Sequence, residues 1–203
     1  TDVSLIVTKE RKDLNSLIYM NSINELNYIK ENNSYIEVGA TTPLINFDSF
    51  IKKYFPDFSQ ILKRYGSVQI RNICTIAGNI ATASPIGDTL PLLLVLDSQI
   101  VIKDKSKTQI LPLNGFFIGY RKTKLKKGQF IHSIRIPLLK KNIFKAYKIS
   151  KRIDDDISSV CASFNIEINN NKIKKIRIAY GGMSSIPKRA FNCEKILLNS
   201  FLS

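Results

Sequence analysis

The sequence predicts an α+β protein in which short helices and antiparallel strand pairs occupy separate stretches of the chain. Three observations support this class. Apolar residues recur at helical spacing through residues 47–65, and period-2 alternation flanks asparagine turns within residues 27–38 and 157–180. In addition, 44% of the 203 residues are hydrophobic, which is enough to bury a core without disulfides or metal ions.

The first elements each have a clear sequence signal. Residues 27–38 alternate on both sides of Asn32-Asn33, which predicts a β-hairpin. Residues 47–54 and 58–65 carry apolar side chains three and four positions apart. They predict two short helices separated by Pro56, because proline ends a helix that precedes it.

The run from Arg71 to Pro91, RNICTIAGNIATASPIGDTLP, carries few charges in a chain otherwise crowded with Lys and Asn. Gly78 followed by Asn79 predicts a turn that is open to positive φ and to close approach by a ligand. Asp88 predicts the N-cap of a short buried helix. A loop, a helix start and backbone donors in one place are how proteins hold phosphates, although such turns also simply link core segments.

The second half is predicted to consist mostly of strands. Residues 99–103 and 108–111 form one pair, and alternation places His132, the only histidine, on a further strand. His132 has no neighbours in sequence that would complete a metal site or a catalytic triad, so we interpret it as a packed strand residue. A strand at 144–150 precedes the long hairpin within 157–180, which turns at three asparagines.

The chain closes with a predicted amphipathic helix over residues 188–199. Pro137 and the lysine-rich residues after it interrupt the apolar pattern near residues 138–143. The sequence therefore predicts two domains, residues 1–139 and 143–203.

Charge and cysteine content narrow the class of protein. The 31 Lys and Arg residues exceed the 16 Asp and Glu residues by 15, which raises the possibility of nucleic-acid binding. The basic residues are scattered beside turns without an aromatic platform, so they predict a solvated surface that docks an acidic partner, rather than nucleic acid. No apolar stretch reaches membrane length. Cys74, Cys161 and Cys193 lack metal-site spacing and predict buried, reduced thiols in a cytoplasmic protein.

The central run resembles the flavin-contacting segment of the molybdenum hydroxylases, specifically the FAD-binding subunit or domain of xanthine dehydrogenases. The segments FFIGYRKT (116–123) and GQFIHSIRIP (128–137) add to the resemblance. It implies a PCMH-type FAD-binding α+β domain over residues 1–139, lacking its N-terminal part. A small α+β C-terminal domain of the carbon monoxide dehydrogenase flavoprotein type follows over residues 143–203, and we expect the natural protein to extend beyond both ends.

The resemblance also implies a set of cofactor-binding residues, with no catalytic residue and no metal ligand. Thr1, Gly78 and Asn79 would hold the FAD pyrophosphate, and Asp88 would bind the nucleotide half. Lys148 would supply a cation that favours the reduced, anionic flavin. The full set is Thr1, Asp2, Tyr65, Thr75, Ile76, Ala77, Gly78, Asn79, Asp88, Ile131 and Lys148.

Two of these assignments, and one loop, have plainer alternatives. Tyr65 is equally a core contact at the end of its helix, whereas the resemblance places it, like Ile131, against the flavin nucleotide. The loop Lys151–Asp156 either caps the element that follows it or, by resemblance, lies near the flavin face where nicotinamide enters.

The function implied is electron transfer within a larger complex. FAD would take electrons from iron-sulfur clusters and pass them as hydride to NAD, while partner chains or domains carry the clusters and the molybdenum cofactor. Two alternatives remain close to this one: the FAD subunit of another molybdenum hydroxylase, acting on carbon monoxide or a heteroaromatic ring, and a docking subunit without flavin. A basic nucleic-acid-binding protein is the third.

Overall fold

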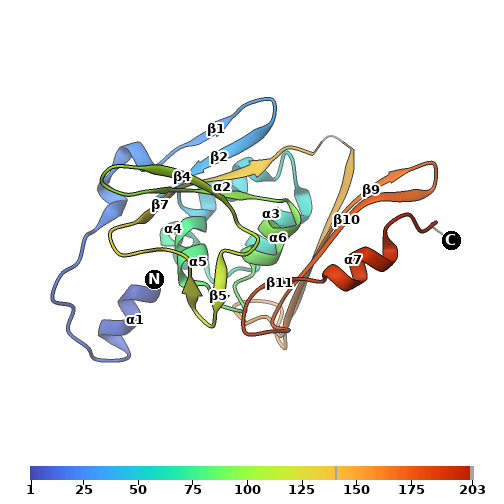
Figure 1. Ribbon diagram of the computed structural model, residues 1–203. Helices are drawn as coiled ribbons and strands as arrows, with labels where there is room; N and C mark the ends of the chain where they lie inside the picture. The colour runs from blue at the N-terminus through green and yellow to red at the C-terminus, as the bar shows by residue number, and fades with distance from the viewer. Residues whose placement is uncertain (140, 202–203) are drawn as a thin grey trace.

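A layer of short helices lies between two antiparallel sheets in the computed structural model, which describes residues 1–139 and 141–201 (Figure 1). The first sheet uses strands up to Pro137, and the second begins at Asn142. Lys140, within the predicted domain boundary, and residues 202–203, at the end of the second predicted domain, lie outside the described residues.

The first sheet has the order β1-β2-β7-β3-β4, and every neighbouring pair is antiparallel. Its strands are β1 (Ile29–Glu31), β2 (Tyr35–Gly39), β7 (Phe130–Pro137), β3 (Gln99–Lys103) and β4 (Thr108–Pro112). The predicted hairpin and strand pair are therefore confirmed, and His132 lies on the central strand β7 as predicted. A separate two-stranded pair joins β5 (Phe117–Gly119) to β6 (Lys122–Thr123).

Five helices cover the inner face of this sheet. They are α2 (Leu44–Ile51), α3 (Pro56–Lys63), α4 (Val68–Ile73), α5 (Ile76–Thr82) and α6 (Thr89–Val95). The two helices predicted around Pro56 are present. Helix α2 begins three residues earlier than predicted, directly after Pro43, and α3 begins two residues earlier because Pro56 itself occupies its first position. Every residue of α6 is buried.

The second sheet has the order β11-β10-β9-β8. Its strands are β8 (Asn142–Ile149), β9 (Val160–Asn169), β10 (Lys172–Gly181) and β11 (Lys188–Arg189). Helices α3 and α6 pack against this sheet from one side, and α7 (Phe191–Leu197) lies along its other side in Figure 1. The long predicted hairpin is confirmed as β9 and β10.

The predicted closing helix is wrong at its start. Lys188 and Arg189 extend the second sheet by pairing with Tyr180 and Ala179, so α7 begins only at Phe191. The unpaired edge of β10 provides backbone hydrogen bonds to these residues. Helical periodicity in the sequence contains no information about such a neighbouring edge.

The N-terminal residues are loosely packed. Helix α1 (Asp2–Thr8) contains no buried residue, and the turns η1 (Met20–Ser22) and η2 (Asn24–Leu26) follow it. Thr1 occupies the N-cap position of α1, but its side chain makes no capping hydrogen bond. The apolar Ile18 is 85% exposed.

One apolar core joins the helices to both sheets. It includes Phe47, Phe58 and Leu93 of the helical layer together with Cys161 and Ala179 of the second sheet. None of the helices in the described part of the chain has the length and apolar character needed to cross a membrane.

The three cysteines are free. Cys74 and Cys161 are buried as predicted, whereas Cys193 is exposed. That prediction is wrong because α7 buries only Glu194, which leaves Cys193 on the solvent side of the helix.

Candidate functional site

The site predicted around Gly78 is built on the start of helix α5. Thr75 has extended backbone angles, and its Oγ1 accepts a hydrogen bond from the Gly78 N–H at 2.9 Å. This is the geometry of an N-cap, which orients the first helical turn. A Cβ on Gly78 would lie 3.1 Å from the same Oγ1, so glycine leaves the cap undisturbed.

The predicted Gly78-Asn79 turn is therefore wrong. Both residues lie inside α5, and the residue with positive φ is Ala83, at the C-terminal end of the helix. The sequence placed a helix start after Asp88, whereas the structure has a capped helix start at Thr75 as well. The signal for it was present, since a threonine directly before an apolar residue such as Ile76 is typical of an N-cap.

Asn79 connects α5 to two neighbouring segments. Its Nδ2 donates to the Tyr65 hydroxyl at 3.1 Å, and its Oδ1 accepts from Thr89 Oγ1 at 2.5 Å. Burial raises the pKa of Tyr65 well above its ordinary value, so this phenol stays protonated. The structure thus brings together two predicted residues, Tyr65 and Asn79, and adds Thr89, which sequence reasoning missed.

Asp88 and Lys148 form a buried ion pair. Lys148 Nζ lies 2.7 Å from Asp88 Oδ2, and the two side chains are 2% and 7% exposed. Asp88 precedes α6 as predicted, but it makes no capping hydrogen bond, because its carboxylate is turned toward Lys148 and the Ser158 hydroxyl. Asp88 therefore stands at the predicted N-cap position of a buried helix, and only the capping hydrogen bond is missing, for this tertiary reason.

Three further residues complete this buried cluster and were missed by sequence reasoning. The Arg64 carbonyl accepts a second hydrogen bond from Lys148 at 3.0 Å, Ser158 donates to Asp88, and Cys161 Sγ donates to the Asp88 carbonyl at 3.5 Å. Burial, followed by the charge of Asp88, raises the pKa of the Cys161 thiol. No sequence signal marked these residues, since they lie far from Asp88 along the chain.

Thr1 lies beside the approach to α5. Its Oγ1 is 3.1 Å from Cys74 Sγ, one residue before the Thr75 cap. Asp2 points elsewhere and pairs with Arg121 at 3.4 Å on the surface, where such pairs contribute little. The structure thus places Thr1 next to the capped turn, whereas Asp2 makes its ion pair on the surface.

The remaining predicted residues contribute buried surface. Ile76 and Ala77 point into the core, so they offer only their backbone N–H groups. Ile131 is buried on β7, against which α5 packs. These side chains support the position of the helix start from behind.

The start of α5 fits an anionic phosphate group. The N–H groups of a first helical turn have no partner within the helix, and the helix end carries partial positive charge. Gly78 is exposed and adds no side chain in front of these donors. Among the described residues, no group of three or more His, Cys, Asp or Glu side chains is placed to hold a metal ion.

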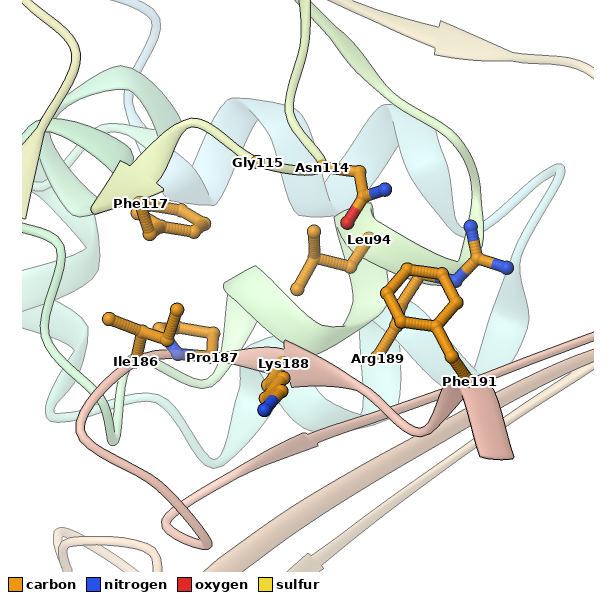
Figure 2. A pocket seen from close by; sticks show the side chains of 9 residues that line it. All are labelled: Leu94, Asn114, Gly115, Phe117, Ile186, Pro187, Lys188, Arg189 and Phe191. Carbon is orange, nitrogen blue, oxygen red and sulfur yellow. The ribbon is translucent and has the colours of Figure 1, made fainter. Parts of the chain in front are cut away.

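A separate cavity of about 190 Å³ lies where the C-terminal end of α6 meets the start of α7. Figure 2 shows Phe117, Leu94 and Ile186 facing a common space, with Asn114 and Arg189 at its edge. The cavity contains none of the predicted site residues. Arg189 forms an ion pair with Glu194, which neutralises the charge of Arg189.

Both parts of the chain match known protein families. Residues 1–139 match the FAD binding domain in molybdopterin dehydrogenase, and residues 145–203 match the CO dehydrogenase flavoprotein C-terminal domain. Xanthine dehydrogenase of Emericella nidulans is 31% identical over 97% of this chain, which spans 16% of that protein. The glyceraldehyde dehydrogenase medium chain of Sulfolobus acidocaldarius is 30% identical over 92% of this chain and 67% of its own length.

Solved structures share the fold. Carbon monoxide dehydrogenase from Hydrogenophaga pseudoflava superposes with a TM-score of 0.94 at 23% identity, covering 100% of this chain and 71% of that chain. Quinoline 2-oxidoreductase from Pseudomonas putida 86 gives a TM-score of 0.89 at 18% identity, with the same coverage. At these identities the likeness concerns the fold alone.

Proposed function

Because the chain belongs to the family of FAD-binding domains in molybdopterin dehydrogenases, we propose that it holds FAD as the electron-transfer component of a xanthine dehydrogenase-like molybdenum hydroxylase. The expectation drawn from the resemblance, both of family and of α+β fold, is confirmed at this level. The redox partners and the reaction of the whole complex are part of the proposal.

The capped start of α5 is the observation that carries the proposal. The Gly78 and Asn79 N–H groups are already bound to Thr75, so the FAD pyrophosphate binds at the backbone N–H groups of Ile76 and Ala77, with Thr1 beside them. Tyr65 lies at the side of this turn through its hydrogen bond to Asn79, and its ring supplies apolar surface for the nucleotide. Ile131 supports the turn from the core.

Asp88 and Lys148 take a different part in the proposal from that implied by the resemblance. Each neutralises the other, and both are nearly inaccessible to solvent. We therefore assign them to hold the second sheet against α6, next to the cofactor, rather than to touch FAD. A cation paired in this way exerts only a weak net field on a neighbouring group.

When bound, FAD accepts single electrons from a metal cluster and releases a pair as hydride to an acceptor such as NAD. The chain's own residues bind and orient the cofactor and supply no acid, base or nucleophile. Iron-sulfur and molybdopterin components, on partner chains or domains, are the proposed electron donors. Free thiols at Cys74 and Cys161 favour a reducing compartment, and we place the protein in the cytoplasm.

Titration of the protein with FAD tests the proposal. A bound-flavin absorption spectrum and quenched flavin fluorescence are expected. Thr75→Ala should weaken FAD binding by about tenfold, because the first turn of α5 loses the hydrogen bond that orients its donors.

Ser67→Ala is the matched control. Ser67 caps α4 by accepting from the Ile70 N–H at 3.3 Å, so its loss should destabilise the protein by a similar amount, about 1 kcal/mol, and leave FAD affinity unchanged. Absence of a flavin spectrum in the wild type would favour the docking subunit without flavin. DNA retention that falls steeply with salt would favour nucleic-acid binding.

A further inference from the structure

The side chain of Arg64 holds an exposed loop of the second sheet. Its guanidinium donates three hydrogen bonds: Nε to the Ile153 carbonyl at 3.0 Å, Nη1 to the Lys148 carbonyl at 2.8 Å, and Nη2 to Ser150 Oγ at 2.9 Å. Arg64 is the C-cap residue of α3, and it lines a groove of about 400 Å³ between α3 and β8.

The loop over residues 150–157 connects β8 to β9 and has little packing of its own. Ile153 and Ile157 are 75% and 68% exposed, and the internal hydrogen bonds centre on Asp156, which accepts from the Arg152 and Ile157 N–H groups. The element that follows this loop is the strand β9 (Val160–Asn169), so its carboxylates have no helix N-terminus to cap. Tertiary contacts therefore have to determine where the loop lies.

Those contacts converge on the candidate site. Lys148, just before the loop, donates to the Arg64 carbonyl and to Asp88, and Ser158, just after it, also donates to Asp88. Tyr65, the residue next to Arg64, accepts from Asn79 of α5. Hydrogen bonds from the loop to Arg64, the peptide bond between Arg64 and Tyr65, and the hydrogen bond from Asn79 to Tyr65 thus connect the loop to the capped helix start.

We propose that Arg64 is a positioning residue that couples the 150–157 loop to the candidate FAD site. This inference rests on the proposed function. Arginine suits the role because one planar group reaches three acceptors at once, which a lysine ammonium on a flexible stem cannot reproduce. Coupling of this kind is reciprocal: FAD that orders the turn around Tyr65 and Asn79 also orders the loop.

Limited trypsin digestion measures the coupling, because Lys151 and Arg152 place two cleavage sites within the loop. Arg64→Ala should speed cleavage there by at least about tenfold, since the loss of even one of its three charge-assisted hydrogen bonds accounts for that much. Cleavage after Lys105 and Lys107, in the turn between β3 and β4, should be unchanged. Saturating FAD should slow loop cleavage in the wild type and have no such effect in Arg64→Ala.

Two variants control for charge and for side-chain length. Lys63→Ala removes one positive charge from the same exposed end of α3 and should cleave like the wild type. Arg64→Lys should cleave at a rate between those of the wild type and Arg64→Ala.

Three results would overturn the inference. Loop cleavage in Arg64→Ala at the wild-type rate would remove the positioning role. An equal increase in the cleavage rate at Lys105 and Lys107 would indicate that Arg64→Ala loosens the whole protein rather than the loop. Bound FAD that fails to protect the wild-type loop would remove the coupling, whereas failure of the wild type to bind FAD at all would overturn the proposed function together with the coupling.

Discussion

The ion pair between Asp88 and Lys148 joins residues that lie 60 positions apart in the chain. A buried charge left without its partner is strongly destabilising, because neither water nor a counter-charge solvates it. Lys148→Met and Asp88→Asn should each lower the free energy of unfolding by about 3–5 kcal/mol, measured by urea denaturation.

The double variant Asp88→Asn/Lys148→Met distinguishes this pairing from general damage. It should cost much less than the sum of the two single changes, since no unpaired charge remains. Additive losses would mean that the two side chains act independently.

The contribution of Glu37, on strand β2 of the first sheet, to the stability of the protein depends on pH. Burial alone would raise the pKa of Glu37, but hydrogen bonds from Ser133, Arg135 and Tyr28 outweigh it and lower the pKa below its ordinary value. A carboxyl with a lowered folded-state pKa stabilises the protein above its unfolded pKa, about 4.3, and this contribution is lost as the pH falls through the folded-state value.

Glu37→Gln should therefore lower the free energy of unfolding by about 1 kcal/mol at pH 7, and the difference from wild type should shrink below about pH 4. Glu31→Gln is the matched control, because Glu31 pairs only loosely with Lys53, at 3.8 Å. Urea denaturation of the three proteins at pH 7 and pH 3 is the measurement. A difference that stays constant with pH would show that Glu37 contributes by packing alone.

At the level of elements, the turn after β10 depends on the absence of a side chain. Gly182 has φ +86°, and a Cβ there would lie 2.3 Å from the Ser159 carbonyl oxygen. Its N–H donates to the Pro85 carbonyl at 2.8 Å, so this turn also joins the second sheet to the loop before α6. A substitution here must therefore displace backbone as well as adopt an unfavourable φ.

Gly128 provides a control with nearly the same backbone angle. It has φ +81°, but nothing lies within 4 Å of the position its Cβ would take. Gly128→Ala should cost about 1–2 kcal/mol from its conformation alone, and Gly182→Ala should cost clearly more. Equal losses in urea denaturation would show that the close approach to Ser159 relaxes freely.

Helices and hairpins with strong local periodicity were predictable, because their own side chains decide their type. The segments around Pro56 and the long β9–β10 hairpin are examples. Short elements were less predictable. Lys188 and Arg189 were drawn into the second sheet, and Gly78 into a helix, because neighbouring backbone groups or a cap several residues away outweighed local preference.

At the level of the whole molecule, the two sheets share one apolar core through the helical layer. We expect a single cooperative unfolding transition, since neither sheet can lose this core independently. Saturation with FAD at about 100 times its Kd should raise the free energy of unfolding by about 2.7 kcal/mol.

Riboflavin is the matched ligand for that experiment, because it carries the same ring system without a pyrophosphate. If the capped start of α5 supplies much of the affinity, riboflavin at the same concentration should stabilise the protein much less than FAD. Equal stabilisation by the two ligands would show that contacts other than those of the pyrophosphate with the start of α5 supply the affinity.

The sequence by itself determined the family, the α+β class and most of the longer elements. These depend on local features of the sequence, namely periodicity, turn residues and an extended run of motif residues. It also brought Tyr65 and Asn79 into the same predicted site. Only the tertiary structure decided that Asp88 pairs with Lys148 rather than capping α6, and that Arg64 and Ser158 join them. The physical reason is that a buried charge must be paired with an opposite charge, and the fold determines which one lies close enough. When the two residues are distant in sequence, no local sequence pattern predicts that they pair.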